Sequence, residues 1–312
     1  MDNMKNNKYV FIGGTGRSGT NIFKAILAKH SEVASLPFEH RFIIDPDGIV
    51  DFLNSMGTSW SPFMTDTKLK RLNKFLINLS KKENVKEKYQ EWELSKWFPN
   101  YIKNVEKLNQ NLTTFIYRGF WPGASSTSTD YQIHFSDWKS KNELYQLLGD
   151  FIIENFNDYL LLKNKSIFVE DNTWNILFAN DIKKLVPNSK LINMIRDPRD
   201  VIASFVKQRW CPSTLRDAIK MYKSIINRWL NIEKQLSNSY YKTIKLEDLV
   251  LDKIDTLKDI AEFLGVNFEN SMLDIDTSLS NSGRWQNEFD KKEKKIIETE
   301  LTSLIKKLGY AI

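Results

Sequence analysis

An apolar segment that runs directly into a glycine-rich turn constrains the fold of this 312-residue chain more than any other feature. Residues 9–13 read as a buried strand, and residues 14–20 spell Gly-Thr-Gly-Arg-Ser-Gly-Thr before a helical pattern begins. Glycines allow a tight turn that brings backbone N–H groups close to an anion, and the next helix adds its positive N-terminal end. The segment therefore predicts a strand, a loop and a helix that hold a phosphate or a phosphate-like group.

Two well-known loops match this segment incompletely, and the residues alone leave both alternatives open. Its glycines spell the G-x-G-x-x-G of dinucleotide-binding sites, and Glu39 follows after about 20 residues, as in a nicotinamide-dependent oxidoreductase. Residues 14–21 also resemble the G-x-x-x-x-G-K-[ST] loop of nucleotide kinases and triphosphatases. In that comparison Thr20 replaces the lysine, and Asn21 replaces the hydroxyl that binds Mg²⁺. Because phosphoryl transfer by kinases depends on metal neutralisation, these replacements favour a less charged group such as sulfuryl.

A second segment predicts a further anion-binding turn. Residues 190–195 (Lys-Leu-Ile-Asn-Met-Ile) indicate a buried strand, and Arg-Asp-Pro-Arg-Asp-Val-Ile-Ala-Ser follows it directly. Asp197 is suited to cap a helix, and Pro198 is suited to its first position, where a missing N–H costs nothing. We therefore expect Arg196 at the strand end and Ser204 two turns into the helix to bind one further phosphate.

The two segments together resemble those of sulfotransferases that use 3′-phosphoadenosine 5′-phosphosulfate (PAPS), in the Arg-Ser-Gly-Thr branch akin to bacterial and protein-tyrosine sulfotransferases. The resemblance implies that the first loop holds the 5′-phosphosulfate and that Arg196 and Ser204 hold the 3′-phosphate. It also implies that Arg284, in a loop near the C-terminus, closes over the cofactor. The implied cofactor-binding residues are Gly16, Arg17, Ser18, Gly19, Thr20, Asn21, Arg196, Ser204 and Arg284.

This resemblance implies in-line transfer of a sulfuryl group from PAPS to an acceptor hydroxyl or amine, which leaves 3′,5′-adenosine diphosphate. Arg17 is then a catalytic donor, because negative charge grows on the leaving phosphate. The acceptor must lose a proton, and Glu39 resembles the glutamate base of the protein-tyrosine and heparan branches. His40 and His134 are alternative bases, and an ion pair with Arg41 is the structural alternative for Glu39. The competing functions are a P-loop nucleotide kinase or triphosphatase and a nucleotide-binding relative without catalysis.

Other positions differ from the family or carry open roles. Leu246 stands where the family usually has a tyrosine before Glu-Asp-Leu, and Asn21 stands where many members have a second threonine. Glu170 and Thr173 either face the acceptor or support the next helix, with Thr173 as its N-cap. Three histidines and a single cysteine, Cys211, form no recognisable metal-binding pattern, so no metal is predicted.

Strand and helix patterns alternate along most of the chain, which is typical of α/β proteins with a parallel sheet. We predict a P-loop-type parallel sheet flanked by helices on both faces, in a single domain over residues 1–312. Its strands are predicted at residues 9–13, 33–36, 166–169, 190–195 and 241–246. Its helices are predicted at residues 19–30, 174–186, 198–208, 213–237 and 252–264, before a last helix capped by Asp290 and Glu293.

A mostly helical insertion over about residues 45–160 interrupts this alternation, and we expect it to build the acceptor pocket. The predicted helices lie near residues 66–81, 86–109 and 142–162. Residues 119–129 combine Pro-Gly with several serines and threonines, which indicates a loop.

Composition narrows the remaining classes. A net charge of +6 suits an enzyme with a multiply anionic cofactor, and the lysines are spread through helical patterns, so no nucleic-acid partner is predicted. No apolar run approaches the roughly 18 residues that a membrane span needs. With one cysteine and no apolar stretch before residue 9, we expect a cytoplasmic protein. No pattern identifies the acceptor or the oligomeric state.

Overall fold

The computed structural model describes residues 7–81, 92–122, 131–277 and 281–312. The chain forms two compact units, each assembled from several segments. The first, called the insertion unit below, consists of Met1–Tyr9, Leu36–Phe168 and Asp181–Ser189. The second, called the sheet unit, consists of Val10–Ser35, Val169–Asn180 and Lys190–Ile312.

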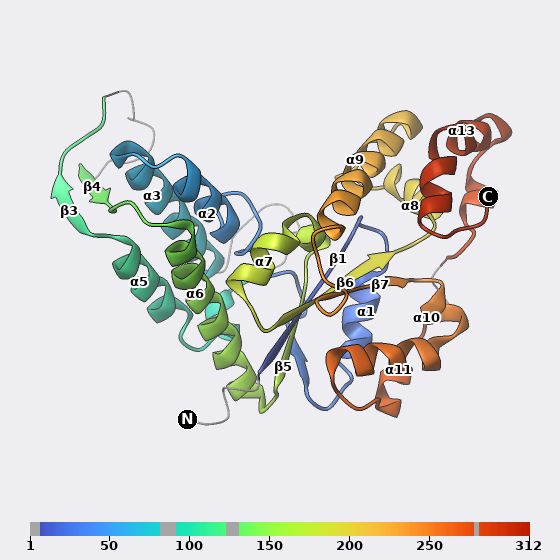
Figure 1. Cartoon of the computed structure of the whole chain (residues 1–312), viewed down its shortest axis with the longest axis horizontal. Coiled ribbons are helices and arrows are strands. Elements are labelled where there is room, and N and C mark those ends of the chain that lie inside the picture. The colour runs from blue at the N-terminus through green and yellow to red at the C-terminus, as the bar shows by residue number, and fades with distance from the viewer. Residues whose placement is uncertain (1–6, 82–91, 123–130, 278–280) are drawn as a thin grey trace. The chain divides into compact units, whose positions relative to one another are not determined.

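Five strands form the sheet that carries both predicted anion-binding turns (Figure 1). They are β1 (Lys8–Gly14), β2 (Val33–Ser35), β5 (Ile167–Asp171), β6 (Ser189–Ile195) and β7 (Tyr241–Lys245). Their order across the sheet is β2-β5-β1-β6-β7, and β6 runs parallel to β7 with Ile195 opposite Lys245. Apolar residues follow one another in β1 and β6 because helices cover a parallel sheet on both faces. The predicted α/β fold with a P-loop-type sheet is confirmed.

The central position of β1 determines where a ligand can bind. The chain leaves β1 for the edge strand β2, returns through β5, and continues with β6 on the other side of β1. In open α/β sheets, ligands bind beyond the carboxyl ends of the strands where the strand order reverses. The turns that follow β1 and β6 therefore start from neighbouring strands at that edge.

Helices of the sheet unit form two groups on opposite sides of β6 and β7 in Figure 1. One group contains α1 (Thr20–Leu27), α10 (Asp248–Leu251) and α11 (Lys253–Leu264), and the other contains α8 (Pro198–Phe205), α9 (Leu215–Glu233) and α13 (Lys291–Lys307). The short elements η3 (Asn270–Asp274) and α12 (Trp285–Glu288) complete the unit.

Local sequence explains where several of these helices begin. The Asp197 side chain accepts a hydrogen bond of 2.9 Å from the Arg199 backbone N–H, and Pro198 occupies the first turn of α8. Asp290 and Glu293 form the predicted capping box of α13. These caps confirm the predicted helix starts.

One predicted helix differs in the structure. The segment predicted as a helix at residues 174–186 begins as a 3₁₀ helix, η2 (Thr173–Phe178), and continues as α7 (Ala179–Leu185). Asn172 rather than Thr173 is the N-cap, because its side chain accepts a hydrogen bond from the Trp174 N–H. The Asn175 side chain donates to the Ile12 carbonyl at 3.0 Å and so ties this tighter turn to β1.

In the insertion unit, helices surround an aromatic core. They are α2 (Ile49–Thr58), α3 (Pro62–Leu79), α4 (Leu94–Trp97), α5 (Tyr101–Leu112) and α6 (Lys141–Lys163). The helices predicted near residues 66–81 and 142–162 correspond to α3 and α6, and 86–109 to α4 and α5, with residues 86–91 outside the described part. Phe42 stands within 6.4 Å of four buried aromatic rings, those of Phe98, Tyr101, Phe151 and Phe156. Across the described residues, no helix combines the length and apolar character needed to cross a membrane.

A two-stranded antiparallel ribbon in this unit has no counterpart among the predicted elements. It pairs β3 (Phe115–Arg118) with β4 (Gln132–Phe135), and Ile116 lies opposite His134. All four residues of β3 are exposed, so the strand lacks the alternation of apolar and polar residues by which a half-buried strand is identified. Of the loop predicted at residues 119–129, residues 123–129 lie outside the described part.

Candidate functional site

The loop after β1 has the backbone shape of an anion cradle. Gly16, Arg17 and Gly19 all have positive φ angles, of 83°, 59° and 94°. Gly19 occupies the N-cap of α1 in the left-handed region, which favours glycine, and no side chain caps this helix. The first N–H groups of α1 are therefore left for a ligand, and the positive end of the helix dipole lies beside them.

Arg17 connects this loop to the second predicted turn. Its side chain is exposed, and its Nε donates a hydrogen bond of 2.9 Å to the Oγ of Ser204 on α8. Ser204 itself is buried. The structure thus brings together two predicted site residues that lie far apart in the sequence.

Arg196 contacts the same loop and is only 6% exposed. It donates from Nη1 to the Arg17 carbonyl at 3.4 Å and from Nη2 to the Asn281 carbonyl at 2.7 Å. Its buried Nε has no hydrogen-bond partner among the described residues. Burial lowers the pKa of Arg196, and the nearby charges of Arg284 and Arg17 lower it further, against the opposing effect of Asp200 and Glu247.

Asp200 joins this turn to the loop near the C-terminus. It is fully buried, and its two oxygens accept backbone hydrogen bonds from Gly283 at 2.7 Å and Trp285 at 3.1 Å. Burial raises the pKa of Asp200, although these N–H groups and Arg196, 3.6 Å away, favour the ionised form. Asp200 therefore holds the loop that contains Arg284 next to Arg196.

Arg284 and the remaining acids near the turn already have partners. Arg284 donates from Nε to Glu288 at 2.9 Å, and its charge contributes to the lowered pKa of Arg196. Asp197 pairs with Arg199 at 2.6 Å rather than with Arg196.

Other predicted loop residues differ in their exposure. Ser18 is fully buried. A Cβ on Gly14 would lie 2.3 Å from the Ser18 Oγ, so this hydroxyl packs against the start of the loop. Thr20 is buried at the first turn of α1, whereas Asn21 is exposed. Leu246, in the place of the family's tyrosine, packs its side chain against Gly19.

A buried ion pair that was not predicted lies at the end of β5. Lys24 on α1 lies 2.5 Å from Asp171, and both side chains are at most 9% exposed. Burial raises the pKa of Asp171, and the charge of Lys24 opposes this shift. The adjacent Glu170 is also buried and accepts a hydrogen bond from the Asn175 side chain. Only the acidic residues were apparent in the sequence, because the lysine partner comes from a separate helix.

Glu39, the predicted base, belongs to the insertion unit. Its Oε2 lies 3.2 Å from Arg41, which is the pairing considered as its structural alternative. Arg41 adopts a left-handed φ of 70° and also lies 3.5 Å from Asp45. His40 is buried and stacks on Phe42 with ring centroids 4.2 Å apart, while His134 lies on β4 of the ribbon.

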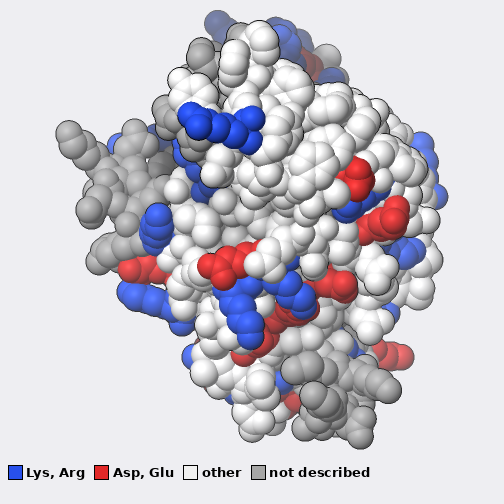
Figure 2. Space-filling view, turned by 90° about the vertical axis from the view of Figure 1, so that its left-hand side faces the viewer, with Lys and Arg blue, Asp and Glu red and all other residues white. Residues whose placement is uncertain are grey.

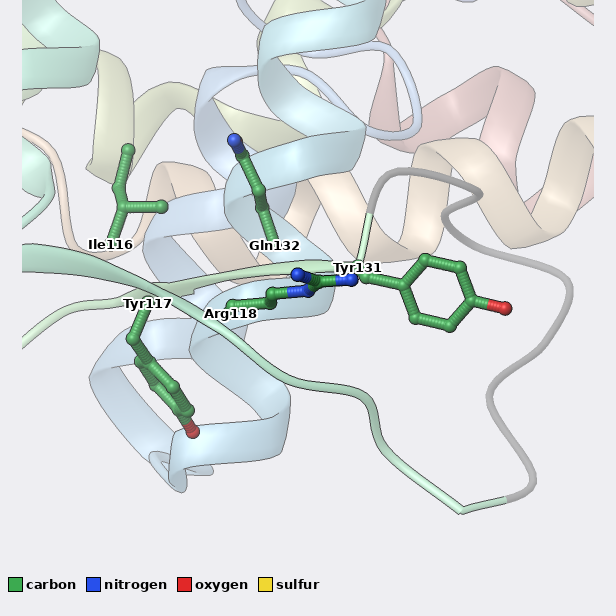
Figure 3. A pocket seen from close by; sticks show the side chains of 5 residues that line it. All are labelled: Ile116, Tyr117, Arg118, Tyr131 and Gln132. Carbon is green, nitrogen blue, oxygen red and sulfur yellow. The ribbon is translucent and has the colours of Figure 1, made fainter.

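The ribbon of the insertion unit also carries a cavity, which has a volume of about 300 Å³ (Figure 3). It is lined by Ile116, Tyr117, Arg118, Tyr131 and Gln132. In Figure 3 the Arg118 side chain extends along the ribbon toward Tyr131, whereas Tyr117 points away from Ile116 and Gln132. This cavity lies within the segment predicted to form the acceptor pocket.

Charged side chains show no simple clustering on the face drawn in Figure 2. Basic groups there lie beside acidic ones, and broad areas carry neither charge. Among the described residues, no group of three or more His, Cys, Asp or Glu side chains is arranged to hold a metal ion.

Comparisons with known proteins identify the family and support the fold. A sequence model of the Sulfotransferase family matches residues 10–270. The sulfotransferase domain of the olefin synthase of Synechococcus PCC 7002 has a similar structure, with 17% identity, a TM-score of 0.54, and coverage of 98% of this chain and 96% of that one. The sulfotransferase domain from the curacin biosynthetic pathway is similar too, with 17% identity, a TM-score of 0.51, and 98% of each chain covered. No curated protein matches the chain. At these identities the structural likeness establishes the fold.

Proposed function

Because the chain belongs to the sulfotransferase family, we propose that it transfers the sulfuryl group of PAPS to a hydroxyl or amine of an acceptor molecule. The observation that carries the proposal is the hydrogen bond between Arg17 and Ser204, which joins the loop after β1 to the helix after β6. Arg196 donates to the backbone of the same loop, so the two turns share one surface. A donor with anionic groups at its 3′ and 5′ positions requires two such turns.

The residues at this surface suit a multiply anionic ligand. The charges of Arg17 and Arg284 both lower the pKa of Arg196, whereas those of Asp200 and Glu247 raise it. An anion bound beside these arginines would further favour their charged forms. Arg196 also has one buried N–H without a partner among the described residues, and α1 has no side-chain cap. We assign the 5′-phosphosulfate to residues 16–21 and the 3′-phosphate to Arg196, Ser204 and Arg284.

When bound, PAPS supplies the sulfuryl group: the acceptor oxygen bonds to sulfur while the bond from sulfur to the 5′-phosphate oxygen breaks, and that oxygen keeps the electron pair. Arg17 and the N–H groups at the start of α1 stabilise the charge that grows on this oxygen. Glu39 accepts the proton that the acceptor loses, and Arg41 orients its carboxylate.

The competing kinase or triphosphatase is disfavoured by the residues around the loop. Asn21 is exposed and has no hydroxyl for Mg²⁺, and the loop has no lysine. At the end of β5, where P-loop enzymes place an Mg²⁺-binding aspartate, Asp171 is neutralised by Lys24. A nicotinamide enzyme would leave the Arg196 turn without a role.

A ligand-binding measurement tests the donor. Thermal unfolding is followed with 3′,5′-adenosine diphosphate, with ATP and Mg²⁺, and with NAD. A ligand that binds only the folded protein stabilises it by about 2.7 kcal/mol at 100 times its Kd. We expect the bisphosphate to raise the Tm most. Stabilisation by ATP and Mg²⁺ without stabilisation by the bisphosphate would overturn the proposal.

A transfer measurement tests the reaction. Sulfur-labelled PAPS is incubated with the protein and an extract of its host, and the labelled product is identified. We expect the label to move to a discrete acceptor, and Glu39→Gln to slow that transfer without weakening the binding of the bisphosphate. Binding without any transfer would support the nucleotide-binding relative without catalysis.

A further inference from the structure

A half-exposed tryptophan lies directly against the loop that follows β1. Trp210 belongs to the segment between α8 and α9 and is 50% exposed. A Cβ on Gly16 would lie 2.7 Å from the Trp210 Cη2 atom and 3.4 Å from the Thr173 methyl group. The absence of a side chain at Gly16 therefore leaves the space that this indole ring occupies.

Neighbouring aromatic rings hold the Trp210 side chain in place. The Trp174 ring meets it edge to face, with centroids 6.1 Å apart and planes at 82°. Phe205 on α8 packs on it at 5.7 Å. A large aromatic ring that is fixed on one side and exposed on the other offers apolar contact area at little entropic cost. Phe205 is fully buried, whereas Trp174 is only partly buried, so both indole rings remain accessible beside the loop.

The same segment lies near the charged group assigned to catalysis. The Trp210 ring reaches Gly16, which directly precedes Arg17 in the chain. Burial raises the pKa of the adjacent Cys211 to about 11, and the charge of Arg17 opposes this shift. The exposed indole face thus borders the position that the transferred sulfuryl group occupies in the proposed function.

We propose that Trp210, supported by Trp174, forms the wall on which the acceptor lies, and that the acceptor carries its hydroxyl on a molecule with a flat apolar ring. The inference rests on the proposed function, because the sulfuryl group must pass from the loop to a molecule beside it. Two perpendicular indole rings form a corner that contacts a flat ring on its face and on its edge. The acceptor wall then belongs to the sheet unit, in addition to any contribution from the insertion unit.

The chemistry of the corner favours an apolar ring over a sugar. The rings that pack on Trp210 are those of Trp174 and Phe205, and beside it Thr173 turns its methyl group toward Gly16. A sugar exposes several hydroxyl groups, and a buried hydroxyl without a hydrogen bond costs free energy. A phenol-like ring places one hydroxyl toward the loop and its carbon face against the indole.

The test compares Trp210→Ala and Trp210→Phe with the unchanged protein, with 2-naphthol as the ring acceptor and n-octanol as the linear one. Calorimetry measures 2-naphthol binding to the protein loaded with 3′,5′-adenosine diphosphate, and labelled PAPS gives KM and kcat. We expect Trp210→Ala to weaken 2-naphthol binding and raise its KM about tenfold, and Trp210→Phe to lose less, because a phenyl ring retains part of the stacking. The KM for the linear acceptor and the Kd of the bisphosphate should change less than about twofold.

Ile254→Ala is the control, since Ile254 is also an exposed apolar residue of the sheet unit, at 48%, but lies on α11. It should leave all four quantities unchanged. The rise in Tm caused by the bisphosphate, compared between Trp210→Ala and the unchanged protein, shows whether the loop remains intact.

The outcomes separate the two proposals. If the unchanged protein does not bind the bisphosphate, the proposed function fails. If it binds the bisphosphate but the loaded protein does not bind 2-naphthol, or if Trp210→Ala affects both acceptors equally, only the Trp210 inference fails. The inference also fails if a sugar alcohol such as octyl glucoside is sulfated in preference to both probes.

Discussion

The arginine-bearing turns of the sheet unit bury charged side chains, whereas the β3–β4 ribbon of the insertion unit exposes apolar ones. In the turns, charged groups are buried: Arg196 is 6% exposed and Asp200 is fully enclosed. In the ribbon, apolar groups are exposed: Phe115 is 51% exposed and Ile116 is 52% exposed. The buried charges are compensated by partners within the chain, such as the pairing of Arg196 with Asp200, whereas the exposed apolar side chains are not covered by the described residues.

The class of ligand can be inferred for the turns but not for the ribbon. Buried arginines specify the charge, the geometry and even the number of anionic groups that they can bind. Exposed aromatic rings specify only that their partner has an apolar surface. The predictions below separate groups that bind the donor from groups that support the fold, and then test whether the ribbon is independent of both.

The largest effect is expected from the ion pair between Lys24 and Asp171. Lys24→Met leaves Asp171 buried without its cation and should lower the free energy of unfolding by about 3–5 kcal/mol. Urea denaturation measures this change. Lys107→Met, which removes a lysine that is paired with Glu154 at the surface, is the control and should change stability by less than about 1 kcal/mol. A loss as small as that of the control would show that the pair does not support the fold.

Arg17→Ala should affect catalysis and leave the fold intact. Arg17 is exposed, and its one side-chain hydrogen bond among the described residues goes to Ser204, so stability should change by no more than about 0.5 kcal/mol. Removing a donor to the leaving phosphate should lower kcat about 10²–10³-fold. Labelled PAPS and melting curves measure the two effects on one sample. Comparable losses in kcat and stability would give Arg17 a structural role instead.

Arg196→Met should weaken binding of 3′,5′-adenosine diphosphate about 10–100-fold, because it removes charge-assisted hydrogen bonds to the 3′-phosphate. Calorimetry measures the Kd. Arg216→Met is the matched control, since Arg216 pairs with Glu300 at the surface of the same unit. An unchanged Kd for Arg196→Met would refute the assignment of this turn to the 3′-phosphate.

The smallest effect is expected from the ribbon. Tyr117→Ser should change the free energy of unfolding by no more than about 0.5 kcal/mol, because the side chain is exposed. The Kd of the bisphosphate should stay within about twofold. A rise in the KM for the acceptor alone would support the prediction that the insertion forms an acceptor pocket. A weakened bisphosphate would show that the two regions are not independent.

Elements fixed by neighbouring residues could be predicted from the sequence. The apolar run and glycines of β1 and its loop, the Asp197 cap of α8, and the Asp290–Glu293 capping box act within a few residues. The assignment of Thr173 as N-cap failed by one residue, because Asn172 makes the same kind of hydrogen bond. Such competition between adjacent polar residues is decided by the packing of the whole turn.

Contacts between distant segments could be predicted only in part. Two turns with paired arginine and serine suggested a shared ligand, but the direct contact of Arg17 with Ser204 depends on side-chain conformation. The sequence could not identify Lys24 as the partner of Asp171, because many other lysines lie in similar helical patterns. The position of Trp210 was missed for a related reason: only the fold brings its ring to Gly16.

The order β2-β5-β1-β6-β7 has a consequence for how the protein emerges from the ribosome. The central strand is made first, but both of its neighbours, β5 and β6, follow only after the whole helical insertion. At about 5–20 residues per second, β1 waits roughly ten to thirty seconds before either edge is paired. During that interval an apolar strand is open to wrong partners, so a chaperone that shields the nascent N-terminal segment should raise the yield of native enzyme.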